Sequence, residues 1–336
     1  MVIAARHRAE LAASLIALVA GTATGSTVIV PVANREEADI VHRWCQGTGN
    51  SVYAVHGESV EIYRGSFPES AVGMSAERRP GYRLWLYTNF HCNLACDYCC
   101  VESSPRSEPR MLSAESVSRL VTEGVEAGAG EVYLTGGEPF LHPDIAQIVS
   151  ICVAAAPTVL LTNAMLLRGS RLEALASMPR DGLTLQVSVD SPTADLHDLH
   201  RGKGSWMRAL AGVRTVTELG FRVRLATTLA SDTPHDTAAF GNLCTELGLA
   251  PEDTIVRSIA QQGSATSGIL ISRATVVPEV CVTAAGVYWH PVAALDPAMR
   301  VSSDVHPLAK SIDEITTEFL HYRRAGDVLA ATFPCA

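Results

Sequence analysis

The sequence predicts an α/β fold built from parallel βα units, and two observations carry that prediction. From Tyr82 onward, short apolar runs alternate with amphipathic segments of helical period, a pattern typical of parallel strands joined by helical crossovers. Clusters of cysteine, glycine and acidic residues directly follow several of the apolar runs. In closed βα barrels the chemistry sits at these carboxyl ends of the strands, so we expect the functional site there.

The expected strands lie near residues 82–90, 131–136, 158–162, 183–189, 221–228 and 254–259. The expected helices lie near residues 113–127, 143–155, 171–177, 205–219 and 235–248. Several of these helices have plausible start signals, since Ser113, Asp144 and Pro234 stand at their first turns.

Two flanking regions break this alternation. Residues 1–70 predict a small α+β domain, with helices near 5–19 and 36–46 and strands near 26–33, 51–55 and 60–63. Residues 71–81 contain Gly73, Pro80 and several charges, which indicates a linker. The βα region then covers residues 82–262. Residues 263–336 form a C-terminal extension, with a hairpin near 281–291 and a helix near 311–323.

Composition narrows the functional classes. The chain has 336 residues, of which 47% are hydrophobic, and a net charge of −9, which argues against a basic surface for nucleic acid. Nine cysteines, an odd number in a long chain, argue against a secreted disulfide framework. We expect a cytoplasmic protein that does not enter a membrane. Residues 1–26 favour an amphipathic helix over a signal peptide, because Glu10 interrupts the passage from basic to apolar residues.

The most informative stretch is the cysteine loop that follows the first expected strand. Cys92, Cys96 and Cys99 have the spacing CxxxCxxC. Thiolates are the usual protein ligands of iron–sulfur clusters, whereas a structural zinc site normally needs four ligands. Three thiolates on one loop can hold three irons of a cubane and leave the fourth iron open for another ligand. Cys100, next to the last of them, is not expected to be a ligand.

One βα unit later, the second expected strand ends in Gly136-Gly137-Glu138-Pro139. Glycines let a backbone approach a ligand closely. Together with the cysteine loop, this segment resembles the radical S-adenosylmethionine (radical SAM) superfamily. The resemblance implies a partial (β/α)6 TIM-type barrel, one 4Fe-4S cluster held by the three cysteines, and SAM chelated to the open iron. It also implies that the Gly-Gly-Glu-Pro segment receives the SAM ammonium group.

The resemblance extends to later strand ends. Asn163 lies in a Thr-Asn-Ala segment that is similar to the Thr-Asn-Gly of the superfamily, with Ala164 in place of glycine. Ser188 and Asp190, followed by His197-Asp198 and Arg201-Gly202, are similar to a segment that holds the SAM carboxylate or ribose. A bidentate guanidinium suits a carboxylate, although Arg201 could instead form a surface ion pair with Asp195 or Asp198. The further SAM-binding candidates are Tyr98 near the adenine and Arg224 near the ribose or substrate.

The implied activity is reductive cleavage of SAM to a 5′-deoxyadenosyl radical, which abstracts hydrogen from a small metabolite or a peptide. A flavodoxin or ferredoxin would supply the electron. The alternatives are a sulfur-inserting enzyme of the same superfamily and a non-catalytic iron–sulfur carrier. The intact Gly-Gly-Glu-Pro and Arg201 segments argue against a carrier, which needs no SAM pocket. The sequence does not reveal the substrate or the redox outcome.

The two flanking regions carry fainter resemblances. Residues 1–70 are similar to the TusA/SirA-like sulfur-carrier fold, but the carrier cysteine is absent and Cys45 is expected in the core. The C-terminal extension is similar to SPASM or "twitch" extensions, which hold auxiliary clusters. We expect no second cluster, because the extension has only Cys281 and Cys335, with Cys244 or His290 as the other candidate ligands. His290 is either a proton-transfer residue over the substrate or a structural residue, and Trp289 is its apolar neighbour.

Overall fold

The structure is a computed structural model that describes residues 11, 14–65, 70–228, 234–250, 253–257, 259–273 and 276–324. The chain divides into two compact units. The smaller unit holds Met1–Ser75, Ser272–Val277 and Thr317–Pro334, and the larger holds Ala76–Ile271, Pro278–Thr316 and Cys335–Ala336. We describe each unit by itself.

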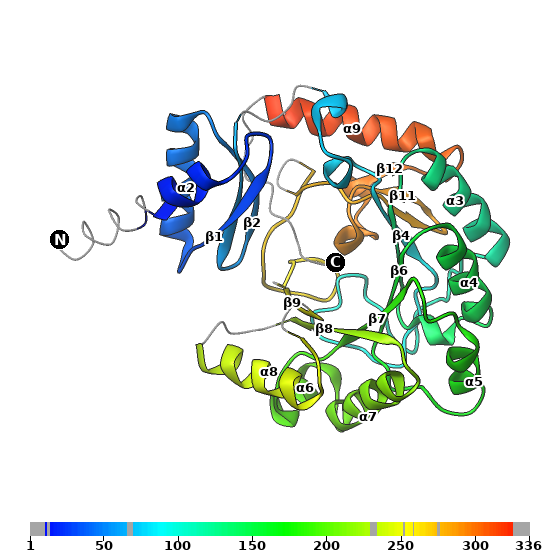
Figure 1. Cartoon of the computed structure of the whole chain (residues 1–336). Coiled ribbons are helices and arrows are strands. Elements are labelled where there is room, and N and C mark those ends of the chain that lie inside the picture. The colour runs from blue at the N-terminus through cyan, green and yellow to red at the C-terminus, as the bar shows by residue number, and fades with distance from the viewer. Residues whose placement is uncertain are drawn as a thin grey trace. The chain divides into compact units, whose positions relative to one another are not determined.

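A nine-stranded sheet forms the centre of the larger unit, in the order β12-β11-β10-β4-β5-β6-β7-β8-β9. Six consecutive parallel strands of this sheet, β4 to β9, match the six expected ones and confirm the α/β fold with a partial TIM-type barrel core (Figure 1). These strands are β4 (Arg83–Tyr87), β5 (Glu131–Thr135), β6 (Thr158–Thr162), β7 (Leu183–Ser188), β8 (Arg222–Thr228) and β9 (Thr254–Arg257).

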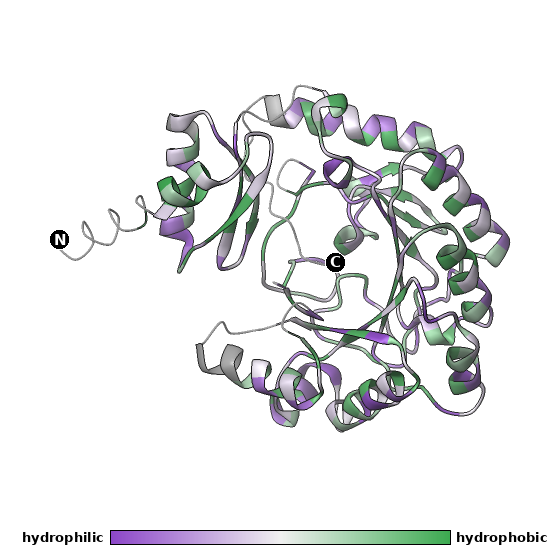
Figure 2. Ribbon diagram, in the orientation of Figure 1, coloured by the Kyte–Doolittle hydropathy of each residue, from purple (hydrophilic) through white to green (hydrophobic). Residues whose placement is uncertain are grey.

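The helices of the larger unit cover one side of this sheet, and Figure 1 shows α3, α4, α5 and α7 along its outer face. Leu84 of β4 points toward α3, since a Cβ atom at Gly124 would lie 2.6 Å from its Cδ2. The helices are α3 (Ala114–Glu126), α4 (Ile145–Ala155), α5 (Ser170–Ser177), α6 (Ala194–Arg201), α7 (Ser205–Glu218) and α8 (Pro234–Glu246). Figure 2 shows hydrophobic and hydrophilic residues alternating along these ribbons, as packing against a sheet requires.

Helix α6 is a helix that sequence reasoning missed. It has only eight residues and a polar sequence, ADLHDLHR, with His197 as its buried residue. Gly202 follows it with φ of 97°, a left-handed value that glycine adopts without strain. The helix matters because it carries Arg201 to the carboxyl end of the sheet.

The opposite face of the sheet lines the inside of the partial barrel. Trp85 and Tyr133 are paired in register and their rings stack with centroids 4.4 Å apart. Register pairing carries this face through Val159, Thr184 and Arg222 on the next three strands. Paired residues of a parallel sheet share a face, and the face repeats every second residue. Of these five inner-face residues, all but Val159 are aromatic or polar, while Leu84 and Leu86 on the outer face of β4 are aliphatic.

The expected hairpin near residues 281–291 is present, and it extends the main sheet. Strands β10 (Cys281–Thr283) and β11 (Gly286–Tyr288) pair antiparallel, and β10 pairs parallel to β4. Strand β12 (Arg300–Ser302) adds to β11, and helix α9 (Leu308–Arg324) follows. The C-terminal residues Phe333-Pro334-Cys335-Ala336 lie outside the described residues.

The smaller unit has a three-stranded antiparallel sheet in the order β1-β3-β2. Its elements are β1 (Thr27–Pro31), α2 (Arg35–Thr48), β2 (Ser51–His56) and β3 (Ser59–Tyr63), and residues 14–21 are helical. Asn34 caps α2 by accepting a hydrogen bond from Glu37 N at 3.0 Å. Cys45 is buried, and burial raises the pKa of its thiol to about 12. The resemblance of this unit to a sulfur carrier stays a prediction.

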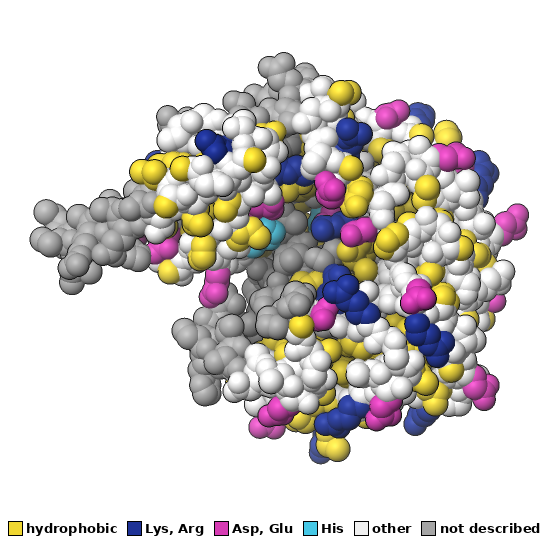
Figure 3. All heavy atoms as spheres, viewed as in Figure 1, with side chains coloured by type: hydrophobic (Ala, Val, Ile, Leu, Met, Phe, Trp, Pro, Cys, Tyr) yellow, Lys and Arg dark blue, Asp and Glu magenta, His cyan; other side chains and the backbone are white. Residues whose placement is uncertain are grey.

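Helix length and surface charge add two observations. None of the described helices combines the length and apolarity that a membrane span requires. On the face shown in Figure 3, basic and acidic side chains are interspersed rather than gathered into a patch of one sign.

Glu279 connects the start of β10 to the inner face of β4. Its side chain is 6% exposed, and it accepts hydrogen bonds from Trp85 Nε1 at 2.5 Å and Arg83 Nη1 at 3.4 Å. Arg83 has a second carboxylate partner, Glu131, at 3.3 Å. The indole N–H therefore depends on Glu279 more than the guanidinium does.

We predict that Glu279→Leu lowers the free energy of unfolding by about 1–3 kcal/mol, because it leaves the buried Trp85 N–H without an acceptor. Glu279→Gln, which supplies an amide oxygen of the same shape, should lose clearly less. Denaturant titration of both variants measures the difference. Equal losses in the two variants would contradict this account of the contact.

Candidate functional site

The three motif cysteines lie on the loop that follows β4. Cys92 is buried, and Cys96 and Cys99 are partly buried. The thiols are close enough to affect one another: burial, Glu138 and the other two cysteines raise the pKa of Cys92 to about 12. Burial likewise raises the pKa of Cys96 to about 11, although the Arg201 guanidinium opposes the shift.

The donors around these thiols fit an iron–sulfur cluster. Leu94 N donates to Cys92 Sγ at 3.4 Å, and Ser103 N donates to Cys99 Sγ at 3.3 Å. Hydrogen bonds to sulfur tune and stabilise cluster thiolates. No three His, Cys, Asp or Glu side chains in the described part of the chain are placed to hold one metal ion. A cluster places its thiolates on separate irons.

The two glycines after β5 are required by the cysteine loop itself. A Cβ atom at Gly136 would lie 2.6 Å from Asn89 O, and one at Gly137 would lie 2.1 Å from His91 O. Because no side chain stands between the two segments, their backbones form hydrogen bonds. Gly137 N donates to Asn89 O and Glu138 N donates to His91 O, both at 3.0 Å. The sequence predicts that these glycines let the backbone approach a ligand, and the structure adds that they let two strand ends join.

Glu138 is buried at the junction where the segment after β5 meets the loop after β4. Its Oε1 accepts from Phe140 N at 3.1 Å and Thr162 Oγ1 at 2.7 Å, and its Oε2 accepts from Asn163 N at 2.8 Å. Burial raises the pKa of the carboxyl, although these donors oppose the shift. A carboxylate offers about four acceptor positions, so three are filled from within the protein.

Asn163 connects the third strand end to the cysteine loop. Its Nδ2 donates to Asn93 Oδ1 at 2.8 Å and lies 3.9 Å from Cys92 Sγ. Ala164 follows with φ of 55°, a left-handed value that favours glycine. This explains why the resembling segment ends in glycine, and it places backbone strain in this chain at that turn.

Tyr98 and Arg201, both partly buried, form one cluster around the buried Asp190. Arg201 donates from Nε to Asp190 Oδ2 at 2.5 Å and from Nη2 to Oδ1 at 3.1 Å. Tyr98 donates its hydroxyl to Asp190 Oδ2, and the Arg201 guanidinium lies 5.6 Å from the centre of its ring. Although burial opposes ionisation, Arg201 holds the pKa of Asp190 below its ordinary value.

The ion-pair partners proposed for Arg201 from sequence were Asp195 or Asp198, and the structure pairs it with Asp190 instead. Asp198 has another task, since it accepts from Ser205 Oγ at 3.0 Å and Trp206 N at 2.9 Å at the start of α7. His197 Nδ1 accepts from Asp190 N at 3.1 Å, which fixes the chain at Asp190.

Ser188 and Arg224 lie on the inner face of the sheet. Ser188 ends β7 beside Ala226, and Arg224 is paired in register with Gln186. Arg224 is close enough to Tyr133 to lower the pKa of that hydroxyl against the dominant effect of burial, which raises it. Arg224 therefore lies deeper in the barrel than Ser188, with Tyr133 as a neighbour.

His290 is fully buried after β11. Its Nδ1 accepts from Val292 N at 3.3 Å and caps a short 3-10 turn, and burial lowers its pKa to about 3. The imidazole is neutral at neutral pH. These contacts favour the structural role over proton transfer. Cys244 and Cys281 are both buried, and Cys335 lies outside the described residues.

Sequence reasoning missed two contributors to the site. Asn89 donates from Nδ2 to Glu138 O at 3.1 Å and to His91 O at 3.0 Å, so it braces both motifs. Ser264 N donates to Cys99 O at 2.9 Å, and a Cβ atom at Gly263 would lie 2.4 Å from the same oxygen. The Gln262-Gly263-Ser264 turn is the signal that could have revealed this second contact.

Comparison with known proteins agrees with this geometry. The family description "Radical SAM superfamily" matches residues 86–240. Residues 86–240 form a radical SAM domain. The match begins inside β4 and ends in α8, so it includes the cysteine loop, the Gly136–Pro139 segment and the Asp190–Arg201 pair.

Two curated proteins and one solved structure illustrate the likeness of the radical SAM domain. Molybdenum cofactor biosynthesis protein 1 of Drosophila melanogaster is 33% identical over 152 residues, which are 43% of this chain and 26% of that protein. The subtilosin biosynthesis protein AlbA of Bacillus subtilis is 31% identical over 137 residues, 40% of this chain and 30% of AlbA. The chain spans less than a third of either relative. The structure of anSMEcpe with bound AdoMet has a TM-score of 0.53 at 15% identity, covering 70% of this chain and 82% of that one.

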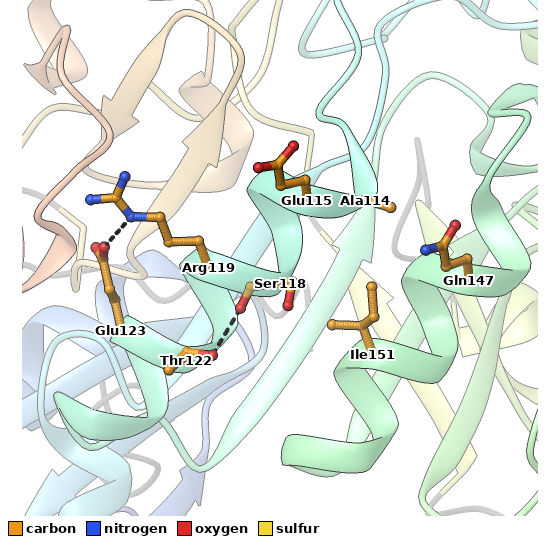
Figure 4. A pocket seen from close by; sticks show the side chains of 8 residues that line it. All are labelled: Ala114, Glu115, Ser118, Arg119, Thr122, Glu123, Gln147 and Ile151. Carbon is orange, nitrogen blue, oxygen red and sulfur yellow. Dashed lines mark hydrogen bonds and ion pairs between the residues drawn. The ribbon is translucent and has the colours of Figure 1, made fainter.

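A groove on the outer surface is separate from this site. Figure 4 shows it between α3 and α4, with Arg119 donating to Glu123 at 2.8 Å along its edge. Helix α3 turns Val117, Leu120 and Val121 into the core, so the groove lies on the helix face opposite to β4. None of its lining residues belongs to the cysteine loop or the strand ends.

We predict that Glu138→Gln weakens the contact between the strand ends. In the parent, Phe140 N and Asn163 N donate to different oxygens of the carboxylate, and in the variant one of these N–H groups must face the amide NH2. The expected loss in free energy of unfolding is about 1–3 kcal/mol, measured by denaturant titration. Glu126→Gln on the exposed surface of α3 is the matched control and should stay within about 0.5 kcal/mol of the parent. A Glu138→Gln protein as stable as this control would refute the junction.

We predict that His290 destabilises the fold in acid. Its pKa is 6.5 in the unfolded chain and about 3 when buried, so the unfolded state takes up the proton first as the pH falls. Stability is complete above pH 6.5 and falls progressively toward pH 3, by about 2 kcal/mol between pH 7 and pH 5 from this group. His290→Asn keeps an acceptor for Val292 N and should flatten the profile over that range. Parallel pH profiles of the two proteins would exclude His290 as the cause.

Proposed function

We propose that this protein binds one 4Fe-4S cluster through Cys92, Cys96 and Cys99 and SAM beside it, and that it abstracts hydrogen from a small metabolite or a peptide. One observation carries the proposal. The cysteine loop and the Gly136–Pro139 segment are joined backbone to backbone, by Gly137 N to Asn89 O and Glu138 N to His91 O. The two motifs therefore serve one site.

The chain's own residues would divide the work at this site. The three thiolates would hold three irons of the cluster, and the remaining acceptor position of Glu138 suits the SAM ammonium group. When bound, the cluster and SAM supply the radical chemistry that breaks an unactivated C–H bond. Burial of Glu138 and Asp190, which are 1% and 2% exposed, would keep water from the reacting groups.

The proposed substrate is a small metabolite or a peptide. The named relatives act in molybdenum cofactor biosynthesis and in bacteriocin biosynthesis, so likeness to them leaves both classes open. A flavodoxin or ferredoxin is the proposed electron donor, and a reducing cytoplasm is the proposed compartment. We propose a single cluster, since the buried Cys244 and Cys281 lie apart in the fold, on α8 and β10.

Anaerobic reconstitution tests the proposal. The parent protein should contain about four irons per chain and should convert SAM to methionine and 5′-deoxyadenosine under strong reductant. Alanine at any one of Cys92, Cys96 and Cys99 should abolish both properties, because a cubane cannot be held stably by two thiolates.

Cys100→Ala is the matched control, since it removes the neighbouring thiol and should leave iron content and SAM cleavage intact. A triple variant that kept a SAM-responsive cluster would overturn the proposed ligands. About eight irons per chain in the parent would overturn the single-cluster proposal.

A further inference from the structure

Arg257 ends the last parallel strand and lies on the inner face of the sheet. It is paired in register with Thr228 of β8, which is six residues after Arg222 and so shares its face. Arg222 in turn belongs to the face that carries Trp85 and Tyr133. Arg257 therefore stands at the carboxyl edge of the sheet, on the barrel side.

The guanidinium of Arg257 lacks acceptors for two of its nitrogens. Its Nε and Nη2 are buried, and neither has a hydrogen-bond partner among the described residues. Leaving a buried charged donor unsatisfied is costly. Such a group in a native fold calls for an explanation, and an unplaced ligand is one.

The neighbouring carboxylate is already occupied. Asp190 lies beside Thr228, whose N–H donates to Asp190 Oδ1 at 3.3 Å. Arg201 uses both oxygens of Asp190, and Tyr98 donates to Oδ2 as well. The positive charge of Arg201 is thus neutralised within the site, whereas that of Arg257 is not.

Arg222 shows what a paired arginine on the same face looks like. At the opposite end of β8 it donates from Nη2 to Asp253 Oδ1 at 2.9 Å, and its side chain is 60% exposed. The two arginines have the same chemistry and the same sheet face. Only the one at the carboxyl edge is without a carboxylate in the described structure.

Gly263 and Ser264, which follow β9 in the chain, contact the cysteine loop. Ser264 N donates to Cys99 O at 2.9 Å, with Gly263 against the same carbonyl. Arg257 and the cluster cysteines therefore belong to the same end of the barrel, where ligands of βα barrels bind.

We infer that Arg257 binds the carboxylate or phosphate of a ligand held at this end of the barrel. A guanidinium presents a planar fork of donors that matches such groups. The anionic group belongs either to SAM or to the substrate, and this inference rests on the proposed function. In both cases the anionic group of the ligand accepts hydrogen bonds from Arg257 Nε and Nη2, for which the described residues provide no acceptor.

The first arm of the test asks whether the anion is the SAM carboxylate. Reconstituted parent, Arg257→Gln and Arg257→Lys proteins are titrated with SAM and with decarboxylated SAM. If Arg257 holds that carboxylate, Arg257→Gln weakens SAM binding by about tenfold to a hundredfold and leaves decarboxylated SAM unchanged. The SAM affinity of Arg257→Lys should lie between those of the parent and Arg257→Gln, since lysine keeps the positive charge but cannot donate two parallel hydrogen bonds.

The second arm asks whether the anion belongs to the substrate. With SAM saturating, the same proteins are titrated with malonate and with inorganic phosphate as probes. If Arg257 serves the substrate, the parent binds a probe at least about tenfold more tightly than Arg257→Gln, and SAM affinity is unchanged. Arg222→Gln is the control in both arms and should behave as the parent.

A third measurement separates ligand binding from a structural role. Arg257→Met removes two buried donors that have no acceptor, so the ligand-free protein should be at least as thermally stable as the parent. A structural arginine would give a clear loss of stability.

The inference is overturned if Arg257→Gln binds SAM, malonate and phosphate as the parent does, or if Arg222→Gln loses as much. It is also overturned if Arg257→Met unfolds at a clearly lower temperature. Failure to assemble a cluster or to bind SAM would defeat the proposed function instead. The probe titrations then run on the cluster-free protein, where loss of phosphate or malonate binding in Arg257→Gln still supports Arg257 as an anion site.

Discussion

The close backbone contact between the end of β5 and the loop after β4 is the constraint on which the site depends. Two main-chain hydrogen bonds of 3.0 Å hold these segments together, and side chains at Gly136 or Gly137 would collide with Asn89 and His91. Because the cysteines are on the same loop, this contact fixes where their thiols can lie. Glu138 then extends it to the third strand through Thr162 and Asn163, so three strand ends behave as one rigid platform.

The charged groups at this platform differ in how many of their hydrogen-bonding positions the protein itself fills. Asp190 is a buried carboxylate whose two oxygens are both bound by protein donors, and Glu138 is a buried carboxylate with three of its roughly four acceptor positions filled. Arg257 is a partly buried cation whose buried Nε and Nη2 have no acceptor among the described residues. Saturated groups give rigidity, while open groups give a ligand something to satisfy. Glu138 follows β5, Asp190 follows β7 and Arg257 ends β9, so all three groups lie at the carboxyl end of the same sheet.

The fold could be predicted from sequence because buried parallel strands leave long apolar runs, and β6 and β8 end within a residue or so of their expected bounds. The cysteine and Gly136–Pro139 motifs could be placed for the same reason, since each directly follows such a run. What escaped prediction depends on distant pairing. Three such features arise from contacts between segments that are not adjacent in sequence. They are the ion pair of Arg201 with Asp190, the parallel pairing of β10 with β4, and the contact of Gly263 with the Cys99 carbonyl. Helix α6 escaped because it has only eight residues, and a helical period is identified over windows longer than that.

The contact between Ser264 and Cys99 has a consequence for the order in which the protein matures. The carbonyl of Cys99 is covered by residues that follow the sixth parallel strand, so the cysteine loop is incomplete until nearly all of the barrel has been synthesised. A nascent chain that has exposed its cysteines, but not yet the residues after β9, lacks this contact. The loop that we propose to hold the cluster would therefore gain its last backbone partner only after the barrel strands have been synthesised.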